Sequence, residues 1–355
     1  MKKLKLLLIS GIPLLPQNNG GATRLKNTLK YLSQKYEITF REVSVVRKSL
    51  WTSITTGIPY HMTNYYNPEL RKLLENESFD EIRIEGTQLL YLAQFLPRDV
   101  PTTFVSLDIS TVSFWRRAWE SNNPFVVLLR LASCLQVYIY EKYYLKRFHQ
   151  VVTMSKIDAA ALSNLFGMNN ILITPNGIDG IHFLPPRTSK IMTLGFIGSQ
   201  SHTPNIAAIN FITENILPAL NTREHEYRVM VLGKFDKLLS ENKHVEIIDH
   251  IDELRDFYSK IDFLVAPIYS GSGTRIKILE SLSYGKPIIT TEIGAEGIGI
   301  KSKLLTIIPY ANERNAKTWV SQITKTYKSI NDLSGELANL EKQLSPLTWE
   351  NIFRS

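Results

Sequence analysis

The sequence predicts an α/β protein built from two doubly wound layers of parallel strands and helices. Two observations support this fold class. Short apolar segments alternate with stretches of helical spacing through the first half, and a second alternation of the same kind begins at Thr193. In addition, the 355 residues exceed what one hydrophobic core usually supports, so two domains are expected.

The first half begins with a short, continuous apolar run at residues 4–9, which is typical of a buried parallel strand rather than a leader or a membrane span. A loop at 11–21 precedes a helix at 22–34, where Leu25, Leu29 and Leu32 share one face. A long helical stretch at 114–149 is rich in aromatic residues, arginine and lysine. Further strands are expected at residues 38–46, 81–84, 102–107 and 151–154.

Turn-forming residues at 174–180, followed by Pro185-Pro186, predict a linker between the two halves. We therefore expect an N-terminal Rossmann-like domain over residues 1–180 and a C-terminal one over 181–334, facing each other across a ligand-binding cleft. The second half is expected to contain strands at 193–197, 228–232, 245–248, 263–266 and 287–291, with helices at 205–220, 254–261 and about 274–284.

Composition narrows the function without deciding it. Hydrophobic residues make up 44% of the chain and charged residues 21%, as in globular proteins. The net charge of +8 favours an anionic partner: a nucleotide diphosphate, an anionic lipid surface or nucleic acid. The one cysteine, Cys134, excludes an intrachain disulfide, which fits a reducing cytosol.

The most informative segment is the glycine-rich loop that leads into the helix at 274–284. Gly271 and Gly273 allow a ligand to approach the backbone closely, and the helix entrance offers unpaired N–H groups to phosphate. Arg275 and Lys277 add positive charge, while Glu280 can accept hydrogen bonds from sugar hydroxyls. The segment therefore predicts a binding site for a nucleotide diphosphate and its ribose. The simpler alternative is that Lys277 and Glu280 form an exposed ion pair on one helix face.

On a helical projection, the apolar side of this helix carries Ile276, Leu279, Leu282 and Ser283, which should face the core. Lys277 and Glu280 fall on a different side.

These residues resemble the signature of the family 4 glycosyltransferases. The main match is Gly273-Thr274-Arg275-Ile276-Lys277-Ile278-Leu279-Glu280, followed by Gly285-Lys286-Pro287-Ile288-Ile289 and Ile293-Gly294-Ala295-Glu296-Gly297. Supporting matches span nearly the whole chain: Gly20-Gly21 with Arg24, Thr153-Met154-Ser155, Pro175-Asn176-Gly177-Ile178-Asp179, Phe196-Ile197-Gly198-Ser199, Pro204-Asn205 and Thr348-Trp349-Glu350.

The resemblance implies the GT-B fold, in which the last helix, about 335–355, packs back on the N-terminal domain. It also implies transfer of a sugar with retention of configuration, a nucleotide-diphosphate sugar of the UDP, GDP or dTDP type as donor, and no cofactor or metal. The donor-binding residues would be Gly198, Lys234, Ile251, Ser272, Gly273, Thr274, Arg275, Lys277 and Glu280. Arg275 and Lys277 would act in catalysis by stabilising the departing phosphate. Gly20, Gly21 and Arg24 would line the cleft from the N-terminal domain.

Two positions depart from the family pattern. Ser272 stands where many members have a glutamate that contacts the transferred sugar. No histidine matches the family's N-terminal-domain histidine, and Asp108 is the nearest candidate for a catalytic or acceptor-side group. The simpler interpretation of Asp108 is a helix N-cap, and that of Arg24 is a solvated surface cation.

The expected acceptor is a saccharide or a lipid-linked oligosaccharide of a bacterial surface, and no nucleic acid is expected because basic residues are dispersed. Trp115, Arg116, Arg117 and Trp119 leave two interpretations open: packing with an exposed basic face, or contact with an anionic membrane. Rival functions are a nucleotide-sugar-binding subunit without turnover, or a hydrolase or epimerase of the same fold. A nucleic-acid-binding protein is the third rival, and nothing in the sequence indicates the oligomeric state.

Overall fold

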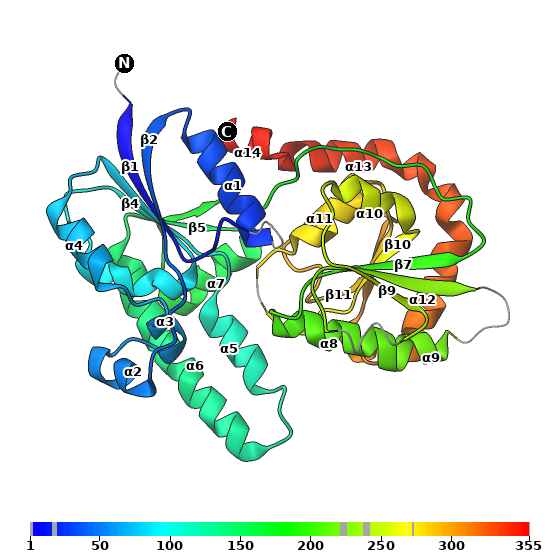
Figure 1. Cartoon of the computed structure of the whole chain (residues 1–355), viewed down its shortest axis with the longest axis horizontal. Helices are drawn as coiled ribbons and strands as arrows, with labels where there is room; N and C mark the ends of the chain where they lie inside the picture. The colour runs from blue at the N-terminus through cyan, green and yellow to red at the C-terminus, as the bar shows by residue number, and fades with distance from the viewer. Residues whose placement is uncertain (1–2, 16–19, 221–225, 237–241, 272, 355) are drawn as a thin grey trace. The chain divides into compact units, whose positions relative to one another are not determined.

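The computed structural model describes residues 3–15, 20–220, 226–236, 242–271 and 273–354. The chain divides into two compact units, each built around its own sheet (Figure 1). The first comprises Met1–Pro175 with Gly271–Gly273, and the second comprises Asn176–Ser270 with Thr274–Ser355.

The sheet of the first unit has six strands in the order β2-β1-β3-β4-β5-β6, and all neighbours are parallel. Strand β1 lies inside the sheet, between β2 and β3, which fits its mainly apolar sequence, and Leu6 to Ile9 are buried. The strands are β1 (Leu4–Ser10), β2 (Tyr36–Glu42), β3 (Glu81–Glu85), β4 (Thr102–Val105), β5 (Gln150–Thr153) and β6 (Ile171–Ile173).

Helices of the first unit begin and end at residues that suit those positions. Asn67, Asn123 and Ser155 cap α4, α6 and α7 by accepting hydrogen bonds from first-turn amides, and Gly167 ends α7 in the left-handed conformation. The helices are α1 (Gly20–Leu32), α2 (Leu50–Thr56), α3 (Tyr60–Thr63), α4 (Pro68–Asn76), α5 (Ser110–Ala118), α6 (Pro124–Tyr144) and α7 (Lys156–Phe166), with 3-10 turns at Thr87–Phe95 and Leu145–Arg147.

Several predictions in this unit were wrong in detail. The strand expected at 38–46 is β2, which begins at Tyr36 and ends at Glu42. The helical stretch expected at 114–149 is two helices, because Asn123 and Pro124 start a new helix after the turn that ends α5. Gly20 and Gly21 were expected to close a loop, but they form the first turn of α1.

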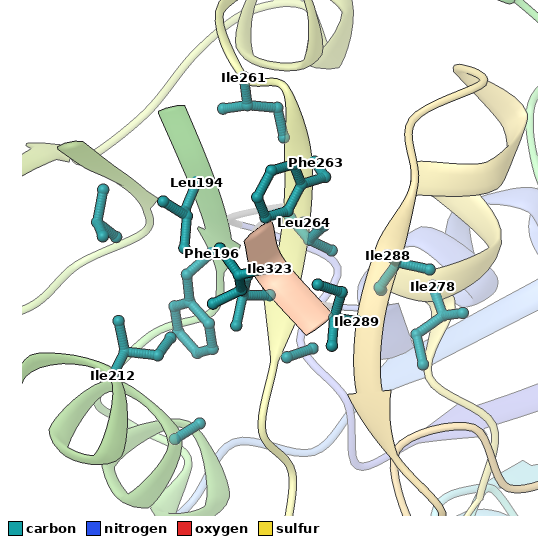
Figure 2. Packing of buried hydrophobic residues seen from close by; sticks show 14 of the residues in the cluster. Leu194, Phe196, Ile212, Ile261, Phe263, Leu264, Ile278, Ile288, Ile289 and Ile323 are labelled. Carbon is teal, nitrogen blue, oxygen red and sulfur yellow. The ribbon is translucent and has the colours of Figure 1, made fainter. Parts of the chain in front are cut away.

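The sheet of the second unit also has six parallel strands, in the order β12-β11-β10-β7-β8-β9. Figure 2 shows the apolar side chains that pack around its central strands, among them Leu194 and Phe196 of β7 and Phe263 of β10. The strands are β7 (Met192–Ile197), β8 (Tyr227–Leu232), β9 (Val245–Ile248), β10 (Phe263–Ala266), β11 (Ile288–Thr291) and β12 (Leu305–Ile308). Together the two sheets confirm the predicted α/β class.

The predicted helix at 205–220 is a composite: α8 (Thr203–Phe211) and α9 (Leu217–Ala219) are joined by a π-helical turn at Ile212–Ile216. The helix expected from about 274 begins at Ile276, with Arg275 as its N-cap. The remaining helices are α10 (Leu254–Lys260), α11 (Ile276–Ser283), α12 (Ala316–Ser329), α13 (Leu337–Leu344) and α14 (Trp349–Arg354), with 3-10 turns at Tyr310–Asn312, Ile330–Glu336 and Ser345–Leu347.

The end of the chain lies within the second unit. The Trp349 amide donates to the Ile178 carbonyl at 3.0 Å, and residues 178 and 348 form a parallel bridge. The packing of the last helix on the N-terminal domain stays a prediction.

The order of strands in the second unit reverses at β7. From there the chain adds β8 and β9 on one side, and it then returns to β10, β11 and β12 on the other. In sheets of this kind the loops after the two central strands diverge, and ligands usually bind between them. A ligand is therefore expected at the carboxyl ends of β7 and β10.

Candidate nucleotide-sugar site of the second unit

The residues predicted to bind the donor follow four adjacent strands, β10, β7, β8 and β9. All four are parallel, so their carboxyl ends lie along one edge of the sheet. Each strand contributes part of the predicted set: Thr274, Arg275, Lys277 and Glu280 after β10, Gly198 after β7, Lys234 after β8 and Ile251 after β9.

A side-chain hydrogen bond crosses the reversal point between β7 and β10. Lys277, in the first turn of α11, donates from Nζ to Oδ1 of Asn205 at 3.0 Å. Asn205 lies near the start of α8, and its Nδ2 donates to the Ser199 carbonyl at 3.1 Å. The Lys277 ammonium also lies 5.1 Å from the ring centroid of Phe196 at the end of β7. The ammonium group is thus held beside the loop that follows β7.

The alternative interpretation of Lys277 as the partner of Glu280 in an exposed ion pair is not what the structure has. Both side chains are only partly exposed, and Lys277 is directed at Asn205. The core-facing side of α11 was predicted correctly, since Ile276, Leu279, Leu282 and Ser283 are all buried.

Burial perturbs both charged groups of α11. It lowers the pKa of Lys277 to about 8, helped by the charge of Arg275 and opposed by that of Glu280. Burial raises the pKa of Glu280 to about 7, as does the charge of Asp179, while Lys277 opposes the shift. Burial makes the charged forms of Lys277 and Glu280 less favourable. Ionisable groups with pKa values perturbed in this way, beside a reversal of strand order, are typical of a binding or catalytic site.

The entrance of α11 is held by a residue from the segment predicted as a linker. Asn176, which is buried, donates from Nδ2 to the carbonyl of Thr274 at 3.2 Å and to its Oγ1 at 2.8 Å. Arg275 donates from its guanidinium to the Ser270 carbonyl at 3.3 Å. Asn176 and Asp179 therefore belong with this site, although the sequence around them was interpreted only as a linker and as a supporting part of the family resemblance.

Glycine is required in the loop before α11. Gly271 and Gly273 have φ angles of +95° and +78°, in the region that residues with a side chain rarely adopt. Both are grouped with the first unit, whereas Ser270 and Thr274 are grouped with the second. Ser272 lies outside the described residues, so its predicted contact with the sugar stays a prediction.

The bottom of the site, at the ends of β7 and β8, consists of main-chain atoms in close contact. The strands pair in register up to Ile197 and Leu232, so Gly198 and Gly233 follow side by side. Gly233 has a φ angle of +132°, and a Cβ there would lie 1.8 Å from the Gly198 carbonyl oxygen. A Cβ on Gly198 would lie 2.6 Å from Cγ of Asn205. Neither position accepts a side chain without movement of the backbone or of Asn205.

Sequence reasoning had not assigned a role to Gly233 or Asn205. The Pro204-Asn205 pair was only a supporting part of the family match, and Gly233 marked only the end of a strand. Their proximity depends on the register of β7 with β8 and on the position of α11, which the sequence alone does not give.

Two other predicted donor residues are less constrained. The Lys234 side chain is exposed, while its carbonyl accepts from the Gln200 amide at 3.0 Å. Ile251 is half-buried and packs against the core of the second unit. Its predicted backbone contact with the nucleobase stays a prediction. The neighbouring His250 is exposed, with Nε2 at 3.7 Å from Asp252.

Arg24, in the first unit, is not a solvated surface cation. Its side chain is 1% exposed, and its guanidinium donates to the Pro175 carbonyl at 2.9 Å. Burial lowers the pKa of Arg24 to about 10, while the charge of Glu85 opposes the shift. Gly20 and Gly21, one turn earlier, are partly exposed at the start of α1. The predicted role of Gly20, Gly21 and Arg24 in lining a ligand cleft stays a prediction.

Asp108 follows β4 and is partly exposed. Its carboxylate accepts from Thr87 Oγ1 at 3.1 Å and from Ser113 Oγ at 3.3 Å. The capping alternative does not hold, because Glu141 of α6 accepts from the first amides of α5, those of Ser110 and Thr111, at 2.9 Å each. A role for Asp108 in the reaction stays a prediction.

In the part of the chain that the structure describes, no group of three or more His, Cys, Asp or Glu side chains is arranged to hold a metal ion. Cys134 is buried.

Comparison with known proteins identifies the type of domain. Residues 192–328 match the sequence model of the family described as glycosyl transferases group 1. A search of curated protein sequences found no match.

The chain is similar in structure to several solved proteins of low sequence identity. One is sucrose-phosphate synthase from Thermosynechococcus elongatus, with 13% identity and a TM-score of 0.73 over 99% of this chain and 97% of that one. Another is HepE from Anabaena in complex with UDP-glucose, with 11% identity and a TM-score of 0.67 over 99% and 97%. A third is WaaG, a glycosyltransferase involved in lipopolysaccharide biosynthesis, with 15% identity and a TM-score of 0.61 over 99% and 94%.

The family match covers the unit that contains the strand-end site, and the structural likeness extends over almost the whole chain. Residues 192–328 are therefore similar to the glycosyl transferases group 1 family, and the chain has the two-sheet α/β fold of the GT-B glycosyltransferases.

Proposed function

We propose that this protein is a retaining glycosyltransferase of family 4 that moves a hexose from a nucleotide-diphosphate sugar to an acceptor hydroxyl. The observation that carries the proposal is the arrangement at the reversal point of the second sheet. There Lys277 is hydrogen-bonded across to Asn205, while Glu280 lies one turn further along the same helix. A phosphate group would pair with the Lys277 ammonium, and an attached ribose would donate hydrogen bonds to the Glu280 carboxylate.

In the proposed donor complex, the diphosphate lies over the backbone at Gly198 and the entrance of α11. Amide groups near Thr274 and the cations of Arg275 and Lys277 would bind the phosphate oxygens. Glu280, as a carboxylate, would accept hydrogen bonds from the ribose hydroxyls. Lys234 and the backbone of Ile251 complete the proposed set on the phosphate and nucleobase sides.

For the chemistry we propose attack by the acceptor on the same face of the sugar that the diphosphate leaves. The bond between the anomeric carbon and the phosphate oxygen breaks, a bond from the acceptor oxygen to that carbon forms, and the acceptor's proton passes to the leaving phosphate. Arg275 and Lys277 would stabilise the negative charge that develops on the diphosphate, without a metal ion. Gly20, Gly21 and Asp108 are the proposed acceptor-side groups of the first unit.

The biological setting is also proposed. HepE was solved with UDP-glucose and WaaG acts in lipopolysaccharide biosynthesis, which supports a UDP-hexose donor and a surface saccharide or lipid-linked acceptor. Synthesis of such acceptors would place the enzyme in the bacterial cytoplasm, at the inner face of the membrane.

The first test is a thermal-shift panel with UDP-, GDP- and dTDP-sugars, because a ligand that binds only the folded state raises the unfolding temperature. A selective rise with one nucleotide sugar is expected, and it should be smaller in Glu280→Gln. Transfer of radiolabelled sugar into a bacterial lipid or polysaccharide fraction then tests turnover. No stabilisation by any nucleotide sugar would refute the proposed donor site.

The same assay separates the rival functions. Free sugar or an epimerised nucleotide sugar formed without acceptor would indicate a hydrolase or an epimerase. Donor binding with no product under any condition would indicate a binding subunit, as expected if Ser272 cannot replace the glutamate found in many members.

A further inference from the structure

Helix α6 is apolar on two opposite faces, and only one of them is buried. Cys134, Val137 and Glu141 lie on the buried face. On the opposite face, at 100° per residue, large apolar side chains fall within an arc of about 120°. Each of them is between 53% and 65% exposed: Phe125, Leu128, Leu129, Leu135, Ile139 and Tyr143. Exposed apolar surface of this extent usually marks an interaction site.

Two tryptophans in the hairpin formed by α5 and α6 are also exposed. Trp115 and Trp119 of the α5 end are 53% and 58% exposed, and their ring centroids are 5.6 Å apart. Figure 1 shows α5 and α6 side by side, with the turn between them extending away from the sheet of the first unit. Tryptophan is favoured at membrane–water interfaces, because one end of the ring is apolar and the other can donate a hydrogen bond.

The charges around this face are predominantly positive. Residues 110–150 contain six lysines and arginines and two glutamates, a net charge of +4, which is half of the +8 carried by the whole chain. One of the two glutamates, Glu141, is buried. Arg147 and Lys142 lie over the rings of Tyr143 and Tyr138, at 5.3 and 5.4 Å from the centroids. Cations beside exposed aromatic and aliphatic groups are typical of surfaces that bind anionic lipid.

We propose that the exposed face of α6, together with Trp115 and Trp119, docks on the surface of an anionic lipid bilayer. We call this set the docking face. Lipid phosphates would pair with the surrounding cations while the apolar side chains enter the boundary between headgroups and acyl chains. A second copy of the chain is a poorer occupant, because two such faces would bring like charges together.

The helix lies on the bilayer and does not cross it. Residues 124–147 are long and apolar enough to span a membrane, and only 22% of the most apolar stretch is buried. However, the buried face of α6 packs against the first unit and is hydrogen-bonded to it. Glu141 accepts from the backbone of Ser110 and Thr111, and the Tyr140 hydroxyl accepts from Gln94 at 2.8 Å. Insertion across the bilayer would break all of these bonds and expose a buried carboxylate to lipid.

The proposal deepens the proposed function, since a docked enzyme would meet a lipid-linked acceptor, but it depends only on the docking face. The test is flotation of the full-length protein with phosphatidylcholine vesicles, with and without phosphatidylglycerol, in the absence of nucleotide sugar. Binding to the anionic vesicles is expected, with partial loss at high salt. The triple variant Leu128→Gln, Leu135→Gln, Ile139→Gln should bind roughly 10-fold more weakly. Ile157→Gln, a change at an exposed position of α7 in the same unit, should bind as the wild type.

Tryptophan fluorescence reports the depth of docking. Brominated acyl chains should quench Trp115 and Trp119, and a Trp115→Phe, Trp119→Phe variant should lose most of the quenching. Trp319 and Trp349 are buried and should not respond.

Three results would overturn the proposal: no binding of the wild type to anionic vesicles, equal binding by the triple variant, or a dimer in light scattering that the triple variant converts to a monomer. Thermal shift with nucleotide sugar, measured on the triple variant, keeps the two proposals separate. A variant that loses vesicle binding but keeps the shift supports docking, whereas vesicle binding without any shift in the wild type contradicts only the donor site.

Discussion

Replacing Lys277 with methionine should stabilise the protein while weakening donor binding. In the folded state, burial lowers the pKa of the Lys277 ammonium from 10.5 to about 8. At about 1.36 kcal/mol per pH unit, the buried charge costs roughly 3 kcal/mol of folding free energy at pH 7. Methionine removes this cost but leaves Oδ1 of Asn205 without its donor, a loss of about 1 kcal/mol. The net gain is therefore about 2 kcal/mol, or roughly 4–8 °C in unfolding temperature.

The Lys277→Met substitution should weaken binding of the nucleotide sugar, although it stabilises the fold. A hydrogen bond from a charged donor to phosphate contributes about 1.5–3 kcal/mol, so the dissociation constant of the nucleotide sugar should rise roughly 10- to 150-fold. Calorimetric titration measures this change, and differential scanning fluorimetry measures the unfolding temperature. Lys260→Met, at an exposed position of α10, is the matched control and should change neither quantity.

The pH dependence of stability provides a further check. A lysine whose pKa is lowered on folding destabilises the native state fully below the folded-state pKa. The cost decreases as the pH rises from about 8 towards 10.5, because the native state then loses its proton before the unfolded state does. The stability difference between Lys277→Met and wild type should therefore narrow over that range. A variant that unfolds earlier than wild type, or that binds the donor equally well, would show that Lys277 is only a structural residue.

Three further predictions concern the same site. Affinity for the intact nucleotide sugar should decline below about pH 7, as Glu280 takes up a proton, and above about pH 8, as Lys277 loses one; calorimetry across this range should show the acid decline disappear in Glu280→Gln. Gly233→Ala should cost more than ~2 kcal/mol in urea unfolding, because its Cβ would overlap the Gly198 carbonyl, and a loss below that would contradict the close contact. Asn205→Ala should weaken donor binding roughly 5- to 10-fold, less than Lys277→Met does, because the ammonium remains but loses its fixed direction; a larger loss than that of Lys277→Met would mean that Asn205 acts in its own right.

Much of the second unit could be predicted from local sequence. Strands β7, β8 and β10 are short, mainly apolar and mostly buried, so β10 has the predicted limits and β7 and β8 differ by one residue each. Strand β9 at the sheet edge also has the predicted limits, although the exposed Glu246 interrupts its apolar residues. The order of motifs along the chain likewise indicated the family, because a glycine loop followed by cations and a carboxylate is typical of a helix entrance that binds phosphate. Strand β12 was not predicted, since three of its four residues at the sheet edge are at least partly exposed and it carries no distinct pattern.

The rest depended on tertiary contacts that local patterns do not encode. Arg24 is a charged residue on an otherwise amphipathic helix, and only the packed first unit shows that its guanidinium is buried beside Pro175. Asn176 lies among turn-forming residues, yet it holds the entrance of α11 almost a hundred positions later in the sequence. Which side of α6 is exposed could not be predicted either. Two opposite faces of the helix are apolar, and periodicity cannot tell which of them is buried.

The contact between Gly198 and Gly233 has a consequence for how specificity can change in such a protein. At the ends of β7 and β8, one part of the surface on which the pyrophosphate is proposed to rest is bare polypeptide, so the shape of that part is independent of side-chain identity. Substitutions at exposed neighbours such as Lys234 can therefore alter the preferred sugar or base while the anchoring point stays fixed. The backbone at the two glycines would thus contribute to binding the diphosphate, while side chains around it would determine which sugar and base are accepted.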